Sequence, residues 1–304
     1  MAENTVKKIA TRESYGNSLK ELAEEFPNLV VLDADLAAAT KTGIFRKAYP
    51  DRHIDCGIAE SNMMGVAAGL SLVGKIPFVS SFAMFAAGRA FEQVRNSIGY
   101  PHLNVKIGAT HAGITVGEDG ATHQCNEDIA LMRTIPGMVV MCPSDDVEAR
   151  AAVRAALEYE GPVYIRFGRA AVPVINDHPG YHFEIGKGTV VREGKDVTIV
   201  ATGICVDSAL GAAKMLEEEG ISAEVVNICT IKPLDEEIII NSAKKTGKVV
   251  TVEEHSVIGG LGSAVCDCLC ANHPVPVKKV GMQDVFGESG SCLLYTSPSP
   301  RDTR

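Results

Sequence analysis

The fold is decided by the stretch IPFVSSFAMFAAGRAFEQVRNSIGYPHLNVKIGATH, which occupies residues 76–111. It starts with a short apolar run at 76–79, continues through a helical pattern at 87–98 and reaches a second apolar run at 105–107. Two buried strands joined by a helix are typical of a βαβ unit, in which the strands run parallel. The stretch therefore predicts a mainly parallel α/β sheet.

The same alternation extends to both sides of this stretch. A helix with Thr11 as its predicted cap precedes a buried strand at 29–32. Further strands are predicted at 138–141 and 163–165, and further helices at 61–72, 127–134 and 145–159, the last with Ser144 as its cap. Apolar runs that alternate with helices indicate a sheet covered on both faces.

A second, smaller unit follows a change in composition. Residues 171–195 are rich in Pro, Gly and His and are predicted to be an interdomain linker that ends in a small hairpin. Strands are then predicted at 197–201, 223–228, 249–252 and 275–280, with helices at 206–219, 235–246 and 261–271. We expect two doubly wound, mainly parallel sheet domains at 5–170 and 196–290, and a non-native tail at 291–304.

Composition excludes several classes of protein. The chain has 304 residues, of which 46% are hydrophobic and 22% charged, as in globular rather than disordered proteins. A net charge of -9 without clustered Lys and Arg disfavours nucleic-acid binding. No apolar run reaches the roughly 18 residues that span a bilayer, and the N-terminus lacks the apolar stretch of a signal peptide. We expect a cytoplasmic protein with neither a nucleic-acid nor a membrane partner.

The nine cysteines do not form a metal-binding or disulfide pattern. Their number is odd, no C-x-x-C pair occurs and no export signal is present, so free thiols are expected. The cluster of Cys266, Cys268 and Cys270 lies in a predicted helix without a histidine at a suitable spacing. We therefore expect no metal site within this chain.

Candidate binding residues follow the predicted strands, because ligands of parallel α/β sheets bind beyond the carboxyl ends of the strands. The residues at these junctions are Asp33, Asp35, Ser80, Ser81, Phe82, Phe85, Thr110, His111, Arg166 and Arg169. The loop between His111 and His123 contains Gly-Glu-Asp-Gly at 117–120, and such acids and imidazoles suit sugar hydroxyls. An arginine at the next junction suits a phosphate.

Each candidate also has a purely structural alternative. Phe82 and Phe85 have the spacing of core aromatics, and His111 and His123 are also consistent with ordinary loop histidines. The two arginines after the strand at 163–165 are consistent with surface charges. Glu60, which enters an apolar helix, is either a helix cap or a buried catalytic acid.

Ordered motifs decide between these alternatives through a family resemblance. The motifs are LDADL at 32–36, CGIAESNMMGVAAGL at 56–70, SSFAMFAAGRAFEQVR at 80–95, THAGITVGEDGATHQCNEDIALMRTIPGM at 110–138, IKPLD at 231–235 and EEHSVIGGLGSAV at 253–265. Together they resemble the pyrimidine-binding and C-terminal domains of the transketolase family across residues 5–290. The resemblance extends to the separately encoded C-terminal transketolase subunits of bacteria and archaea.

The resemblance implies roles at the cofactor, thiamine diphosphate. Glu60 matches the glutamate that hydrogen-bonds the aminopyrimidine and activates the cofactor. Phe82 and Phe85 match aromatics that pack against the pyrimidine, and Asp35 matches an acid near the cofactor.

It also implies roles at the substrate. His111 and His123 match histidines that contact donor-sugar hydroxyls and aid proton transfer, and Asp119 matches an acid that binds a sugar hydroxyl. Arg12 and Arg169 match phosphate-binding arginines. The implied activity is two-carbon ketol transfer from a ketose phosphate to an aldose phosphate.

Three positions depart from the family's pattern. Alanines at 37–39 stand where a phosphate-binding serine is found, Gly88 stands where some members have an aromatic residue, and Ser61 stands where Gln or His is common. These departures bear on the substrate contacts, and they predict weaker binding of the phosphate.

The sequence lacks the Gly-Asp-Gly motif with its following asparagine, which holds the diphosphate and its metal. The resemblance therefore implies an N-terminal transketolase subunit as partner, which holds the diphosphate with magnesium or calcium, and an active site between chains. Self-association is also expected.

Three other functions remain open. In 1-deoxy-D-xylulose-5-phosphate synthase the corresponding loop usually has arginine at the position of His111 and lacks the acid at Glu118. The beta subunit of 2-oxoacid dehydrogenases lacks the histidine-rich loop. A non-catalytic transketolase-like subunit is the third alternative, against which the joint presence of Glu60, His111, Asp119, His123 and Arg169 argues.

Overall fold

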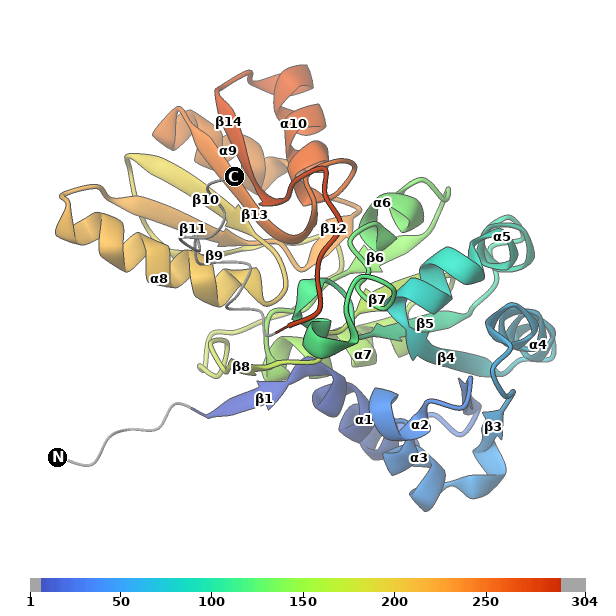
Figure 1. Cartoon of the computed structure of the whole chain (residues 1–304). Coiled ribbons are helices and arrows are strands. Elements are labelled where there is room, and N and C mark those ends of the chain that lie inside the picture. The colour runs from blue at the N-terminus through green and yellow to red at the C-terminus, as the bar shows by residue number, and fades with distance from the viewer. Residues whose placement is uncertain (1–6, 291–304) are drawn as a thin grey trace, which may run out of the picture.

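The computed structural model describes residues 7–290 and contains two α/β units, as Figure 1 shows. The first unit is built on a seven-stranded sheet with the order β12-β6-β7-β5-β4-β2-β3, and the second on a five-stranded sheet with the order β14-β13-β10-β11-β9. The predicted mainly parallel α/β class is confirmed. The tail expected at 291–304 lies outside the described residues.

The first sheet is parallel except at one edge. Its parallel strands are β2 (Leu29–Asp33), β3 (His53–Asp55), β4 (Ile76–Phe82), β5 (Lys106–Thr110), β6 (Val139–Met141) and β7 (Val163–Arg166). Five of these strands, all but β3, are buried along their whole length, because helices cover both faces.

Alternate residues of the strands enter two separate cores. Leu29 and Val31 of β2 face a core that includes α1 (Thr11–Leu22), α3 (Gly43–Ala48) and α7 (Asp146–Glu158). Val30 and Leu32 face the other core, with α4 (Glu60–Leu72) and α6 (Asp128–Arg133). This alternation follows from the two-residue period of a strand.

The second sheet has the same design on a smaller scale. Its strands are β9 (Thr189–Arg192), β10 (Val197–Ala201), β11 (Ala223–Asn227), β13 (Val249–Ser256) and β14 (Val277–Met282), and its helices are α8 (Cys205–Glu218), α9 (Glu236–Thr246) and α10 (Leu261–Asn272). All its strand pairs are parallel except that of β9 with β11. No helix within residues 7–290 is long and apolar enough to cross a bilayer.

The hairpin predicted at the end of 171–195 is wrong. The strand β8 (Ala171–Pro173) pairs with β1 (Lys8–Ala10), whereas β9 joins the second sheet beside β11. A further strand, β12 (Thr230–Lys232), leaves the second half of the chain and pairs antiparallel with β6 of the first sheet. These short strands carry too few residues for an alternating pattern, so only long-range pairing defines them.

Two predicted helix caps are also wrong. Thr11 is the first residue of α1 rather than its cap, and its hydroxyl accepts a hydrogen bond from the Gly168 amide at 2.8 Å. Helix α7 is capped by Asp145, whose carboxylate accepts from the Glu148 amide at 2.9 Å. The Ser144 hydroxyl instead donates to the Glu148 carboxylate at 2.7 Å. The Thr11 hydroxyl is thus used by a residue far away in the sequence, whereas the Ser144 hydroxyl bonds a side chain of α7 and not a backbone amide of its first turn.

The helix predicted at 87–98 is irregular. Two π-helical segments, Met84–Arg89 and Val94–Gly99, flank a short α5 (Phe91–Gln93). The first begins three residues before the predicted start, and π-helical turns are frequent at functional sites.

Replacement of Asp145 by alanine tests the polar support of the segment that joins the two units. Its carboxylate accepts not only from Glu148 but also from the amides of Ile175 and Asn176, both at 2.7 Å. We expect Asp145→Ala to lower the free energy of unfolding by about 3 kcal/mol, because one cap and two buried amides lose their acceptor. Urea unfolding measures the change, and Asp177→Ala, at an exposed neighbouring carboxylate, is the matched control. Equal stability of the two variants would contradict this role.

Candidate active site

The candidate site lies at the carboxyl ends of neighbouring parallel strands. Phe82 of β4 pairs with Thr110 of β5, and Ala109 of β5 pairs with Arg166 of β7. The residues that follow these strands therefore emerge at one edge of the sheet, as the sequence predicted.

Four aromatic rings gather at this edge and form what we call the ring cluster (Phe82, Phe85, His111 and His123). The Phe82 ring stacks on His111 with centroids 3.9 Å apart and on Phe85 with centroids 5.9 Å apart. The His123 ring meets Phe85 edge-on at 5.4 Å. The two phenylalanines thus contact both histidines instead of packing only in the core.

The hydrogen bonds of His111 define its protonation. Its Nε2 lies 3.1 Å from Nη1 of Arg12, and its Nδ1 lies 2.9 Å from the Thr110 hydroxyl. A guanidinium only donates, so Nε2 accepts and Nδ1 carries the proton, which it donates to Thr110. Burial, followed by the charges of the nearby Arg12 and Arg169, lowers the pKa of His111 to about 3. The ring is therefore neutral at pH 7.

Three cationic side chains surround His111 and form what we call the basic cluster (Arg12, Lys41 and Arg169). Nη1 of Arg12 donates to the Ala39 carbonyl at 2.8 Å, and burial followed by the charge of Arg169 lowers the pKa of Arg12. Lys41 follows α2 (Ala37–Thr40) in a left-handed backbone conformation and contributes to the lowered pKa of His111. Sequence reasoning missed Lys41, although it follows directly on the alanine run at 37–39 and Thr40. Clustered cations favour an anionic ligand.

Glu60 is a buried acid that pairs with Arg89. It is the first residue of α4 and is only 1% exposed. Its Oε2 accepts from Nη1 of Arg89 at 2.9 Å, and the Arg89 guanidinium lies 4.5 Å from the centroid of the Phe85 ring. Arg89 therefore connects Glu60 with the ring cluster. Sequence reasoning missed Arg89, although its four-residue spacing from Phe85 is a helical signal.

Asp35 and Asp119 are not brought into the ring cluster. Both are exposed, and neither side chain has a hydrogen bond within the part of the chain that the structure describes. The Asp35 backbone, with φ 60°, donates to the Asp55 carboxylate at 3.1 Å. Asp119 lies in the loop at 113–120, beside Glu118, whose carboxylate accepts from Arg169 at 3.0 Å.

Arg166 is the last residue of β7 and Arg169 follows it, but only Arg169 reaches the site. Arg169 donates to the Val116 carbonyl at 2.5 Å as well as to Glu118. Arg166 is buried, and its Nε donates to the Asp128 carboxylate at 2.9 Å. Its Nη2 donates to the Glu254 carbonyl of the second unit at 2.7 Å. The structure therefore makes Arg166 an interdomain residue and not a surface or ligand-binding charge.

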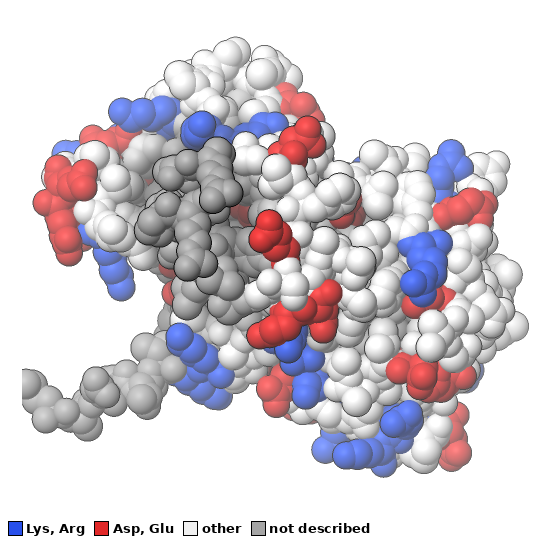
Figure 2. All heavy atoms as spheres, in the orientation of Figure 1, with Lys and Arg blue, Asp and Glu red and all other residues white. Residues whose placement is uncertain are grey.

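Neither metal ligands nor surface charges point to a second site. Among residues 7–290, no group of three or more His, Cys, Asp or Glu side chains is arranged to hold a metal ion. Of the cysteine cluster, Cys268 is buried, Cys266 is half-buried and Cys270 is exposed. On the face that Figure 2 draws, basic and acidic side chains of the described residues are interspersed.

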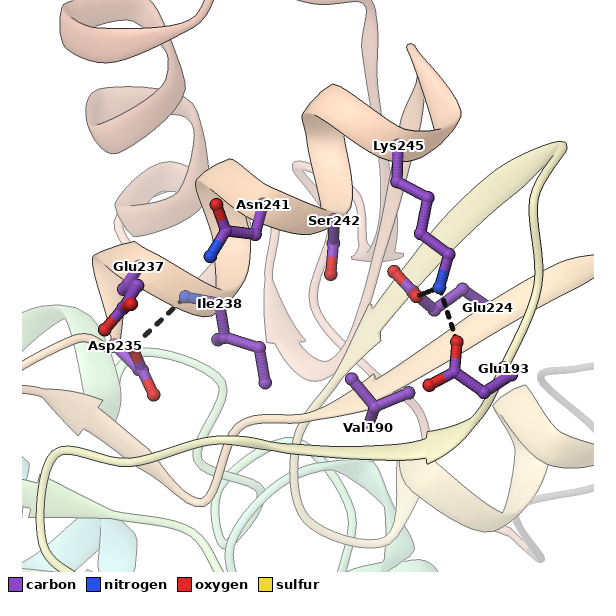
Figure 3. A pocket seen from close by; sticks show the side chains of 9 residues that line it. All are labelled: Val190, Glu193, Glu224, Asp235, Glu237, Ile238, Asn241, Ser242 and Lys245. Atoms are coloured by element: carbon purple, nitrogen blue, oxygen red, sulfur yellow. Dashed lines mark hydrogen bonds and ion pairs between the residues drawn. The ribbon is translucent and has the colours of Figure 1, made fainter.

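A hollow of about 340 Å³ lies apart from these residues, between β9, β11 and α9 (Figure 3). Lys245 extends across it and pairs with both Glu193 and Glu224. The predicted site residues do not line this hollow. Its lining carries four carboxylates, of Glu193, Glu224, Asp235 and Glu237, against the single cation of Lys245, so it does not favour an anionic ligand.

Comparison with known proteins gives the family. Residues 7–174 match the family described as "Transketolase, pyrimidine binding domain", and residues 186–300 match "Transketolase, C-terminal domain". The chain therefore belongs to the transketolase family and corresponds to its C-terminal section.

Individual relatives agree with this assignment. A putative transketolase C-terminal section of Methanocaldococcus jannaschii is 53% identical over 92% of this chain and 88% of its own length. A 6-deoxy-6-sulfo-D-fructose transketolase subunit of Clostridium sp. strain MSTE9 is 50% identical over 92% of this chain and 86% of its own. A solved structure described as a split-gene transketolase, inactive beta4 tetramer, is 60% identical, with a TM-score of 0.85 over 92% of this chain and 91% of that chain.

The low pKa of His111 predicts a pH dependence of stability. The unfolded chain binds a proton at an ordinary histidine below about pH 6.5, but the folded chain binds it only near pH 3, so stability falls as the pH drops between these values. His111→Asn removes this loss, and Asn tolerates the φ of 57° at this position. Between pH 7 and pH 5, we expect the parent chain to lose about 1 to 2 kcal/mol more unfolding free energy than the variant. Urea titrations at both pH values measure the difference, and equal losses would refute the neutral, buried assignment.

Proposed function

We propose that this chain is the catalytic C-terminal subunit of a thiamine-diphosphate-dependent transketolase, which transfers a two-carbon ketol unit from a ketose phosphate to an aldose phosphate. The observation that carries the proposal is the meeting of Glu60, the ring cluster and the basic cluster at one edge of the sheet. A buried acid, an aromatic wall and an anion-binding group are the three parts that such a reaction needs from this chain.

The residues at the cofactor end fit an aminopyrimidine. Arg89 engages Oε2 of Glu60, which leaves Oε1 of this buried carboxylate for a ring nitrogen. Phe82 and Phe85 offer aromatic faces for stacking. When bound, thiamine diphosphate supplies the carbon nucleophile that the side chains of a protein lack. In this proposal Glu60 holds the proton of the pyrimidine nitrogen and Arg89 orients the Glu60 carboxylate.

The two histidines have different proposed roles at the sugar. His111 is neutral, and its Nε2, which accepts from Arg12 in the free chain, would accept from a donor-sugar hydroxyl once Arg12 turns to the anionic end of the sugar. His123 is only half-buried and stands edge-on to Phe85, so it is the better candidate to carry protons to and from the sugar. Asp119 would join them by accepting from a hydroxyl, and Asp35 would approach the cofactor.

The basic cluster is suited to the anionic end of the sugar. Arg12 and Arg169 would bind a phosphate, and Lys41 adds a third positive charge next to the alanine run at 37–39. The name of the Clostridium relative refers to a sulfo sugar, so phosphate and sulfonate donors both belong in the test.

The remaining parts are assigned to a partner. This chain lacks the diphosphate-binding motif, and we propose that an N-terminal subunit supplies it together with magnesium or calcium. The solved relative described as an inactive beta4 tetramer supports both self-association and the need for a second subunit.

Ketol transfer measured with and without the N-terminal subunit tests the proposal. Xylulose 5-phosphate and ribose 5-phosphate, with thiamine diphosphate and magnesium, should react only in the mixture of both subunits. Glu60→Gln keeps the shape of the side chain but removes its charge, and we expect it to lower kcat by roughly 100-fold or more. Glu24→Gln, at an exposed glutamate, is the matched control and should retain full activity.

The same mixture separates the rival functions. Formation of 1-deoxy-D-xylulose 5-phosphate and CO2 from pyruvate and glyceraldehyde 3-phosphate, without ketol transfer from xylulose 5-phosphate, would favour the synthase. A complex that binds thiamine diphosphate but processes neither phosphate nor sulfonate ketoses would favour a non-catalytic subunit. Full activity of Glu60→Gln would contradict the assignment of the buried acid.

A further inference from the structure

The loop at 113–120, which we call the substrate loop, has a backbone conformation that its own sequence does not determine. Gly113, Gly117 and Gly120 all have positive φ, at 74°, 80° and 72°. Glycine enters this region readily but also leaves it readily, because it has little conformational preference. The loop carries Glu118 and Asp119, and its Val116 carbonyl binds Arg169. The geometry of the sugar contacts therefore depends on what holds the loop from outside.

One such contact comes from the second α/β unit. The Thr115 amide donates to Oε1 of Glu254 at 2.6 Å, and Glu254 lies on β13, 139 residues away in the sequence. Glu254 is only 8% exposed. It lies so close to the loop that a Cβ atom at Gly113 would come within 2.2 Å of its carboxyl carbon. The carboxylate thus fills the space beneath the start of the loop.

The end of the described chain adds contacts on the other side of the loop. The Ser289 hydroxyl donates to the Glu118 carbonyl, and the Gln124 side chain donates to the Glu288 carbonyl at 3.1 Å. In Figure 1 the segment after β14 runs back toward the first unit and ends beside it. Both contacts come from the second unit, as does that of Glu254.

Glu254 is itself held in place by Arg166. The Arg166 guanidinium donates to the Glu254 carbonyl at 2.7 Å, and its Nη1 lies 3.9 Å from the Glu254 carboxylate. Arg166 also donates to Asp128 of α6 and to the Cys125 carbonyl at 3.2 Å. The Cys125 carbonyl in turn accepts from the Gly113 amide at 2.9 Å. The same guanidinium therefore supports both Glu254 and the strand bridge at the base of the loop.

We propose that Glu254 is a positioning residue, through which the second α/β unit sets the shape of the substrate loop and thereby the affinity for the donor sugar. Glu254 does not contact the reacting atoms; it acts through the Thr115 amide. The effect on sugar affinity rests on the proposed function, whereas the effect on the loop does not.

A neighbouring glutamate provides a matched control. Glu253 is as deeply buried as Glu254 and accepts from the amides of Leu261 at 2.6 Å and Gly262 at 2.8 Å. These partners start α10 within the second unit. Glu253→Ala therefore removes a comparable carboxylate without touching the substrate loop.

Hydrogen–deuterium exchange tests the loop contact without reference to activity. In Glu254→Ala, amides at 113–120 should exchange at least about tenfold faster, while β2 and β10 remain protected. Glu254→Gln keeps an oxygen that can accept from Thr115 and should restore most of the protection. The proposal is overturned if Glu254→Ala leaves the loop unchanged, if Glu253→Ala accelerates it equally, or if Glu254→Gln is as defective as Glu254→Ala.

Steady-state kinetics of the complex with the N-terminal subunit test the link to the sugar. In Glu254→Ala, KM for the donor ketose should rise by roughly tenfold with kcat changed less than about threefold, because ground-state contacts are lost. A fall in kcat with an unchanged KM would overturn the positioning role. If the parent complex processes no ketose, the proposed function fails, while the exchange experiment still decides the loop contact.

Discussion

The arrangement of the two α/β units depends on the buried guanidinium of Arg166. It ends β7 in the first unit, pairs with Asp128 there, and donates to a carbonyl of β13 in the second unit. A buried charge that loses its partners destabilises the fold by several kcal/mol. Neither unit can therefore move away without leaving the Arg166 guanidinium exposed or unpaired. The relative position of the two sheets follows from this constraint, and with it the position of the substrate loop.

The chemistry of the site follows from what surrounds one imidazole. His111 lies between the face of Phe82 and the guanidinium of Arg12, in a left-handed backbone turn at the end of β5. Burial and nearby cations both oppose its protonation, so the same positive charges that would attract an anionic sugar also keep this ring neutral. Anion binding and the protonation state of the ring are thus set by one group of charges.

The sequence allowed prediction of the α/β class and of the long buried strands, because apolar runs such as that of β10 coincide with the strand itself. It also identified the ring cluster and Arg169 through the junction rule and the resemblance. It could not identify Arg89, Lys41 or Glu254, whose importance lies in side-chain contacts made across the fold. Arg166 and Arg169 are three residues apart and look alike in the sequence, yet only burial against Asp128 separates their roles. The predicted cap at Thr11 is wrong for the same reason, because its hydroxyl bonds the distant Gly168 amide.

The strand β12 has a consequence for how this chain can be divided. Although it belongs to the second half of the sequence, it closes one side of the first sheet by pairing with β6. A fragment cut in the segment 174–188 would leave β6 as an open edge of apolar residues, Val139–Met141, and such edges pair with other chains. If the two halves were exchanged between family members, β6 of one protein would have to pair with β12 of another. The domain boundary in the sequence therefore does not coincide with the boundary between the two sheets in the structure.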